Sequence, residues 1–198
     1  MALRAPAVFV DRDGTLIREV GYLSRSDQIE VLPRVPEAIQ ELHAQGLKVV
    51  VVTNQSAVAR KIISEKQLHQ IHRHLESVLK EAGAFLDGIY YCPHHPTEGA
   101  YPYRVSCVCR KPKPGLVERA SIEMALDPTA SYVIGDQISD MELAFRAGAR
   151  GLLIQPESQS DGQAEVRVRQ PTHVPVTDFW TATQRILRHL KGEGSLEE

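Results

Sequence analysis

Short, continuous apolar runs recur along the chain, separated by longer segments that have the period of an amphipathic helix. Runs such as AVFV and the β-branched LKVVVVT contain no alternating polar residue, which is typical of strands buried on both faces of a parallel sheet. The weaker run HVPV predicts a last edge strand. The predicted strands cover residues 7–10, 47–53, 88–92, 131–136, 151–154 and 173–176.

The segments between these runs carry the start and stop signals of helices. Gly46, Gly83 and Gly148 each follow a periodic segment, where a helix favours glycine just after its last turn. The pairs Ser64 with Gln67 and Ser139 with Glu142 have the three-residue spacing of a capping box. The predicted helices cover residues 35–45, 65–82, 115–125, 140–147 and about 178–190.

This alternation of strand and helix predicts a doubly wound α/β fold, a mainly parallel Rossmann-like sheet with helices on both faces. The 198 residues suit one compact domain, which we expect to cover residues 1–190. The polar segment 156–171 predicts an exposed loop, and residues 191–198 predict a flexible tail.

Composition excludes several classes of partner. A hydrophobic content of 42%, a charged content of 24% and a net charge of −2 are ordinary for a globular protein, and no basic excess indicates nucleic acid. No apolar run approaches the ~18–20 residues of a membrane span, and the first residues do not resemble a signal peptide. The sequence therefore predicts a cytoplasmic protein without a membrane partner, and we expect a monomer.

Acidic residues follow two of the predicted strands. Asp11 and Asp13 come directly after the first strand, and Asp136 and Asp140 follow the fourth. Parallel strands bring such residues to one edge of a sheet, where crowded carboxylates repel unless a cation such as Mg²⁺ joins them. A carboxylate can also act as a nucleophile and form an aspartyl phosphate.

Neutral and basic groups complete the pattern at the same edge. Thr53 ends the second strand and is followed by Asn54, Gln55 and Ser56, which can donate hydrogen bonds to the oxygens of a transferring phosphoryl group. Lys111 can supply positive charge. A single Asp-x-Asp motif is usually a turn or a helix cap. Here the three segments DRDGT, TNQS and GDQISD each follow a predicted strand, and together they indicate a site for phosphoryl transfer.

All three cysteines lie in one segment, residues 92–109, beside two histidines. Cys92 is one residue from His94, and Cys107 is one residue from Cys109. Three thiolates and one imidazole form a closed Cys₃His set, which is typical of structural zinc. The spacing alone leaves His95 open as the fourth ligand. The intervening loop has no core of its own, so zinc can supply the folding free energy that it lacks.

With these residues placed, the chain resembles the haloacid dehalogenase superfamily of phosphatases. DRDGT matches the first motif, TNQS the second, Lys111 the third and GDQISD the fourth. Within the superfamily the chain is most similar to the D-glycero-D-manno-heptose 1,7-bisphosphate phosphatases, which share a zinc loop with the histidinol-phosphate phosphatases. The resemblance covers residues 7–154. The chain lacks the long insertions that would form a large cap domain.

The resemblance implies a Mg²⁺-dependent phosphatase that removes the C7 phosphate of a heptose bisphosphate on the path to cell-envelope lipopolysaccharide. Asp11 would be the nucleophile and Asp13 the general acid and base, while Thr53 and Lys111 would stabilise the phosphoryl group. The resemblance implies that Mg²⁺ is bound by Asp11, the backbone carbonyl of Asp13 and Asp136. It implies that Zn²⁺ is bound by Cys92, His94, Cys107 and Cys109. The residues that it implies for substrate binding are Glu19, Val20, Gly21, Tyr22, Asn54, Gln55, Ser56 and Arg110, with Arg110 on the distal phosphate.

The sequence departs from that family at three positions. Ala57 and Lys61 stand where the family commonly has glycine, and Gln137 stands where it commonly has lysine. These changes bear on the substrate more than on the chemistry. Histidinol phosphate or another small phosphomonoester therefore remains an alternative substrate, and a non-catalytic zinc-loop binding module is a third hypothesis. His69, His72 and His74 lie on one predicted helix, and we interpret them as surface residues.

Overall fold

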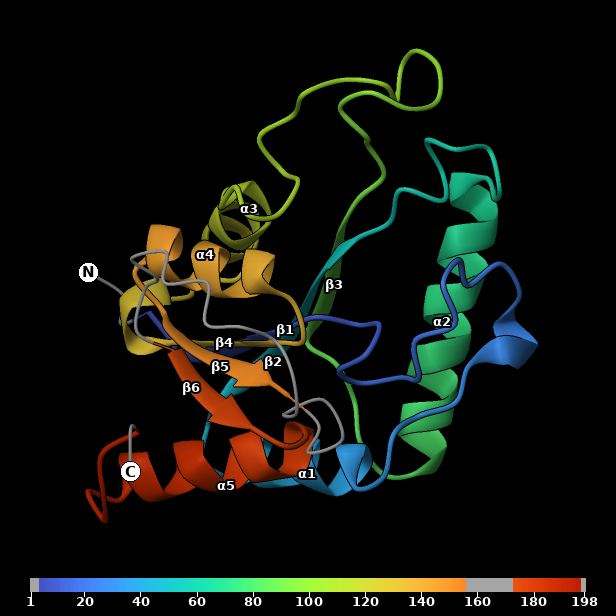
Figure 1. Ribbon diagram of the computed structural model, residues 1–198. Helices are drawn as coiled ribbons and strands as arrows, with labels where there is room; N and C mark the ends of the chain where they lie inside the picture. Colours follow the sequence, from blue (N-terminus) through green and yellow to red (C-terminus); the bar gives the residue numbers. More distant parts are fainter. Residues whose placement is uncertain (1–3, 156–172, 197–198) are drawn as a thin grey trace.

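The computed structural model describes residues 4–155 and 173–196. Six parallel strands form one sheet in the order β3-β2-β1-β4-β5-β6 (Figure 1). The strands are β1 (Ala7–Val10), β2 (Lys48–Asn54), β3 (Gly88–Cys92), β4 (Tyr132–Gly135), β5 (Arg150–Ile154) and β6 (His173–Val176). This order is that of a doubly wound fold, so the predicted fold class is confirmed.

Helices cover both faces of the sheet, as Figure 1 shows with α3 and α4 on one side and α1 and α5 on the other. Alternate residues of β1 separate the two cores: Val8 and Val10 pack with α1, α2 and α5, whereas Ala7 and Phe9 pack with α3 and α4. The helices are α1 (Val35–Ala44), α2 (Glu65–Glu81), α3 (Gly115–Glu123), α4 (Ile138–Ala147) and α5 (Phe179–Leu190), with short 3₁₀ turns at Ser26–Gln28 and Pro128–Ala130.

The helix ends follow most of the predicted signals. Ser64 caps α2, because its hydroxyl accepts the Gln67 N–H at 3.2 Å and Gln67 reaches back to the Ser64 backbone. The box predicted from Ser139 is wrong. Helix α4 begins at Ile138, two residues earlier than expected, and Gln137 is its N-cap, with the Asp140 carboxylate accepting the Gln137 N–H at 3.2 Å.

Two segments of the C-terminal third of the chain were predicted to lack regular structure. The loop predicted over residues 156–171 lies outside the described residues. In the segment after α5, Leu196 is buried in the core and its carbonyl accepts a hydrogen bond from Arg185 at 3.4 Å. The prediction of a flexible tail over residues 191–198 did not include this contact. Among the described residues, no helix has both the length and the apolar character needed to cross a membrane.

Candidate active site

The first strand of the sheet leads directly into the site. β1 lies between β2 and β4, and its pairing with β4 continues to Asp11, whose N–H donates to the Ile134 carbonyl at 2.9 Å. The strand order reverses at β1, and ligands of doubly wound folds bind beyond the carboxyl ends of the strands at such a switch point. A cavity opens at this edge, lined by Asp11, Asp13, Thr53, Lys111 and Asp136 among others.

Lys111 forms the charged centre of the cavity wall. Its ammonium contacts Asp11 Oδ1 at 2.8 Å and Asp140 Oδ1 at 2.7 Å, and its side chain is only 2% exposed. Burial lowers the pKa of Lys111, but the charges of Asp11 and Asp140 more than offset this, so the pKa lies above its ordinary value. Lys111 therefore stays charged at neutral pH.

Asp11 is held through one oxygen only. Oδ1 forms the ion pair with the Lys111 ammonium and accepts a hydrogen bond from the Arg12 N–H at 2.7 Å. No described residue donates a hydrogen bond to Oδ2. That oxygen can therefore approach a phosphorus atom or a metal ion without first breaking a contact to the protein.

The carboxylates at this edge suit a divalent cation. Oxygens of Asp11, Asp136 and Asp140 lie within 4.8 Å of one another, and Asp136 Oδ1 is buried with no hydrogen-bond partner. Burial, and then the charge of Asp11, raises the pKa of Asp136, so the charged form of Asp136 calls for a compensating cation. Both oxygens of Asp140 are engaged, Oδ1 with Lys111 and Oδ2 with the Gln137 N–H, whereas Asp11 and Asp136 each keep one oxygen that accepts no hydrogen bond from a described residue.

Gly14 brings the loop after β1 against these carboxylates. Its φ is +73°, and a Cβ atom at this position would lie 2.3 Å from Asp136 Oδ2. Only glycine permits this approach without displacing the carboxylate. The backbone of the DRDGT loop thus lies beside Asp136. A cation bound by both a carbonyl of this loop and the Asp136 carboxylate would need this proximity.

Hydrogen bonds fix the polar side chains at the carboxyl end of β2. The Asn54 amide donates to the Lys111 carbonyl at 3.2 Å and accepts the Lys111 N–H at 3.0 Å, so it fixes the backbone of Lys111. Gln55 donates to Thr53 Oγ1 at 2.9 Å. Because Thr53 Oγ1 accepts that bond, its own O–H is free to donate to a bound phosphoryl oxygen.

Most of the residues predicted to bind substrate line the cavity, but two do not. Glu19, Gly21, Tyr22, Asn54, Gln55 and Ser56 line the cavity, whereas Val20 and Arg110 are not among its lining residues. Burial is the largest cause that raises the pKa of Glu19, and the charges of Asp13 and Asp136 add to it. Arg110 lies beside the cysteine cluster and donates from Nη1 to the His94 carbonyl at 3.1 Å.

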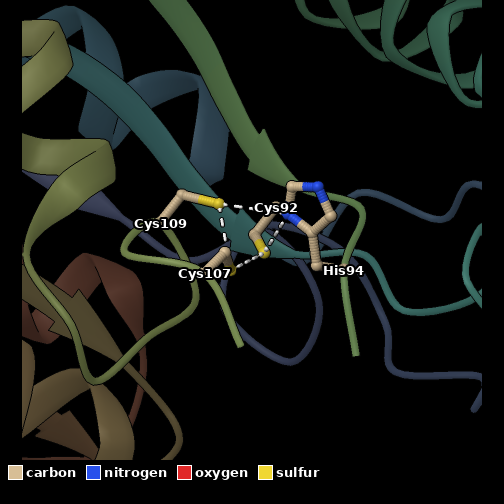
Figure 2. Close-up of side chains that lie close together, drawn as sticks. All are labelled: Cys92, His94, Cys107 and Cys109. Atoms are coloured by element: carbon tan, nitrogen blue, oxygen red, sulfur yellow. Dashed lines mark hydrogen bonds between the residues drawn. The ribbon is translucent and has the colours of Figure 1, made fainter. Parts of the chain in front are cut away.

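The four predicted metal ligands of the cysteine loop lie together, and Figure 2 shows their side chains pointing toward one another. Sulfur–sulfur distances are 3.5 Å for Cys92–Cys107 and 3.3 Å for Cys107–Cys109, and His94 Nδ1 lies 3.6 Å from Cys92 and 3.4 Å from Cys109. A tetrahedral zinc centre has ligand–ligand edges of about 3.5–3.8 Å. The cluster therefore has the size of a zinc site.

The alternative ligand His95 has another role in the structure. Its Nδ1 accepts the backbone N–H of Thr97 at 3.3 Å and of Glu98 at 3.0 Å, which fixes the turn after it. Within the cluster, a hydrogen bond from Cys92, followed by bonds from Cys107 and His94, lowers the pKa of Cys109 to about 5. The thiolate is the form that binds a metal.

Two polar residues of the site were not found from the sequence. Arg12 is 1% exposed and His72 is 5% exposed, and Arg12 Nη1 lies 3.1 Å from His72 Nε2. The interpretation of His72 as a surface residue is wrong, because it faces the core of the fold. A signal was present: His72 follows Leu68 by four residues and precedes Leu75 by three, so it falls on the apolar stripe of α2.

A buried lysine bridging two carboxylates beside a candidate cation site, on a doubly wound sheet, defines a metal-assisted phosphoryl-transfer enzyme. Residues 8–83 match the haloacid dehalogenase-like hydrolase family, and residues 108–182 match a family described as HAD-hydrolase-like. The chain is 46% identical to a D-glycero-beta-D-manno-heptose-1,7-bisphosphate 7-phosphatase of Photorhabdus laumondii, over 72% of this chain and 76% of that protein. It is 42% identical to the protein of that name from Escherichia coli strain K12, over 74% and 77%.

Solved structures agree with this assignment. An HAD-like phosphatase from Mesorhizobium loti is 31% identical, with a TM-score of 0.81 over 97% of this chain and 88% of that one. The D,D-heptose 1,7-bisphosphate phosphatase of B. bronchiseptica, solved with magnesium and phosphate, is 27% identical, with a TM-score of 0.78 over 93% and 99%. The chain belongs to the haloacid dehalogenase-like hydrolase family and is a phosphoric monoester hydrolase.

Proposed function

We propose that the protein removes the C7 phosphate of D-glycero-D-manno-heptose 1,7-bisphosphate by way of an acyl phosphate, the aspartyl phosphate of Asp11. The observation that carries the proposal is the pair of contacts of Lys111 with Asp11 and Asp140, in the wall of a cavity that Asp13 and Asp136 also line. The relatives named for this reaction supply the substrate.

The first chemical step uses the free oxygen of Asp11. Asp11 Oδ2 attacks phosphorus, the bond from phosphorus to the C7 oxygen breaks, and Asp13 gives its proton to that oxygen. The Lys111 ammonium and the Thr53 hydroxyl stabilise the charge on the phosphoryl oxygens. The sugar, now carrying a hydroxyl at C7, can leave.

The second step regenerates the enzyme. Asp13 is now a carboxylate and takes a proton from a water molecule as the water oxygen attacks phosphorus. The bond between phosphorus and Asp11 breaks, which releases inorganic phosphate and returns Asp11 to its carboxylate form. Asp13 ends the cycle protonated, as it began.

Two metals complete the proposal. Asp11, Asp136 and the backbone carbonyl of Asp13 would hold Mg²⁺, which neutralises charge on the transferring group. Cys92, His94, Cys107 and Cys109 would hold structural Zn²⁺. The zinc loop fixes Arg110, whose guanidinium uses Nη1 on the His94 carbonyl and keeps other N–H groups for the distal phosphate.

The test compares substrates that differ in the second phosphate. We expect kcat/KM for the heptose bisphosphate to exceed that for histidinol phosphate about 100-fold, which is about 2.7 kcal/mol in the transition state. Arg110→Gln should remove most of this preference, whereas Arg104→Gln, which changes an exposed arginine of the same loop, should keep it. A preference for histidinol phosphate would assign the chain to that second substrate, and equal turnover of both would leave the heptose proposal without support.

A further inference from the structure

The proton-transferring carboxylate of the proposed reaction is held by a buried arginine. Arg12 Nη2 donates to Asp13 Oδ1 at 3.0 Å and to Oδ2 at 2.9 Å, and Arg12 Nε donates to Oδ1 at 3.2 Å. Gln55 donates to Asp13 Oδ2 at 2.8 Å and accepts from Arg12 Nη2 at 2.9 Å. The orientation of Asp13 therefore depends on where the guanidinium of Arg12 lies.

Arg12 is in turn held by a residue of helix α2, which contacts a different nitrogen of the guanidinium. Arginine only donates hydrogen bonds, so His72 Nε2, 3.1 Å from Arg12 Nη1, must be the acceptor. His72 is therefore the neutral tautomer with its proton on Nδ1. Its ring is buried between turns of the apolar stripe of α2 and lies 5.5 Å from the ring of Tyr91.

We propose that His72 is a positioning residue for catalysis, acting through Arg12 to orient the carboxyl group of Asp13. This proposal rests on the role proposed for Asp13 above. His72 is not among the residues that line the cavity. Without its acceptor, the buried Arg12 Nη1 has no partner, and the guanidinium must shift to find one. Because Asp13 takes three hydrogen bonds from Arg12, it shifts too, and a misplaced acid protonates the leaving oxygen slowly.

Two substrates with different leaving groups can distinguish this positioning role from a general structural role of His72. A sugar alkoxide needs the proton of Asp13 to leave, whereas a p-nitrophenolate leaves without one. The rate of leaving-group release in a single turnover, with enzyme in saturating excess over substrate, should be compared for heptose bisphosphate and p-nitrophenyl phosphate. The proteins are the wild type, His72→Leu, His72→Gln and the control His74→Leu, which changes an exposed histidine of the same helix.

We expect His72→Leu to slow release of the sugar at least tenfold, part of the ~10²–10⁴-fold that general acid–base catalysis contributes, and to slow release of p-nitrophenolate less than about threefold. His72→Gln should restore most of the sugar rate, because its amide oxygen can accept from Arg12. His74→Leu should match the wild type on both substrates. Equal slowing of both substrates by His72→Leu, or no slowing of either, would overturn the proposal.

A second comparison distinguishes failure of this proposal from failure of the proposed function. Asp13→Asn should itself slow the sugar far more than p-nitrophenolate, and adding His72→Leu to it should cause no further selective loss. If Asp13→Asn lacks the leaving-group selectivity, the role of Asp13 is wrong. If Asp13→Asn shows it and His72→Leu alone does not, the acid stands and His72 does not position it.

Discussion

At the scale of single residues, the site combines buried charges that compensate one another. Lys111 lies between Asp11 and Asp140, with side-chain exposures of 2%, 11% and 1%. Burial raises the pKa of Asp140 to about 6 even against the charge of Lys111. Removing one member of such a group leaves its partner charged and buried, which costs more than the intact pair contributes.

We therefore predict that Lys111→Met lowers the free energy of unfolding by about 3 kcal/mol or more, measured by urea denaturation. The double variant Lys111→Met with Asp140→Asn should recover part of this loss, because no uncompensated carboxylate then remains at position 140. Neither variant should hydrolyse the substrate at a normal rate, because both lack the ammonium. A double variant no more stable than Lys111→Met would show that Asp140 does not account for the cost.

His72 makes a pH-dependent contribution to stability. Burial, and then the charge of Arg12, lowers the pKa of His72 from 6.5 to about 3. The unfolded chain binds a proton at this residue as the pH falls below 6.5, and the folded protein does not until about pH 3, so stability is lost as the pH falls through this window. Between pH 6.5 and pH 5 the loss should be about 2 kcal/mol.

The measurement is urea denaturation across this pH range for the wild type and His72→Gln. The variant should have a flatter dependence on pH, because it has no group that titrates at this position. His74→Gln should keep the slope of the wild type. An unchanged slope in His72→Gln would mean that another group causes the acid sensitivity.

Sequence reasoning at this scale predicted the residues at the carboxyl ends of β1, β2 and β4, because strand ends of a parallel sheet must meet at one edge. It could not predict which polar atoms are already in use, since those bonds join residues far apart in the chain, such as Asn54 and Lys111. Arg12 and His72 were missed because charged and polar residues are usually exposed.

At the scale of elements, the loop that follows β2 contains a strained residue. Lys61 has a φ of +59°, in the left-handed region that costs a residue with a side chain about 1–2 kcal/mol. This is one of the two positions where the resembling phosphatases commonly carry glycine. The preference has a physical reason, since glycine adopts this conformation without strain.

We predict that Lys61→Gly raises the free energy of unfolding by about 0.5–1 kcal/mol, because relief of strain exceeds the greater entropy of the unfolded chain. The matched control is Lys66→Gly, which places the same change in the exposed first turn of α2. That variant should lower the free energy of unfolding by up to about 1 kcal/mol. Thermal or urea denaturation gives both signs, and a loss of stability in Lys61→Gly would contradict the strain argument.

The strands and helices themselves were predicted within a few residues, because apolar runs and terminal glycines are local signals. The capping box of α4 was not predicted correctly. Ser139 and Glu142 have the spacing of a capping box, but Gln137 and Asp140 have it too, and the chain turns into the helix directly after Asp136. Spacing alone does not choose between two overlapping boxes.

At the scale of the whole molecule, the sheet and the zinc loop have separate sources of stability. The sheet has two extensive apolar cores, one on each face. The loop between β3 and α3, residues 93–114, extends from the carboxyl end of β3 in Figure 1 and has no core of its own. It holds His94, Cys107 and Cys109, which converge on Cys92 at the end of β3. Metal binding can supply folding free energy on the order of 10 kcal/mol to such a segment.

We predict that a strong chelator removes one zinc per chain, leaves the far-ultraviolet circular dichroism almost unchanged and makes residues 93–109 sensitive to protease. Activity on heptose bisphosphate should fall more than activity on p-nitrophenyl phosphate, because Arg110 follows the last cysteine of the cluster and loses its position. Readdition of Zn²⁺ should restore both properties. Retention of protease resistance after complete zinc loss, measured by metal analysis, would show that the loop folds without metal.

The central claim is that Asp11 forms a covalent bond to the transferred phosphate. The most direct measurement is rapid quenching in acid of the enzyme with Mg²⁺ and heptose bisphosphate labelled with ³²P at C7, followed by peptide mapping. We predict transient label on the peptide that contains Asp11, slower decay of that label in Asp13→Asn, and no label in Asp11→Asn. Turnover by the wild type with no labelled enzyme at any quench time, or label on another residue, would contradict the account.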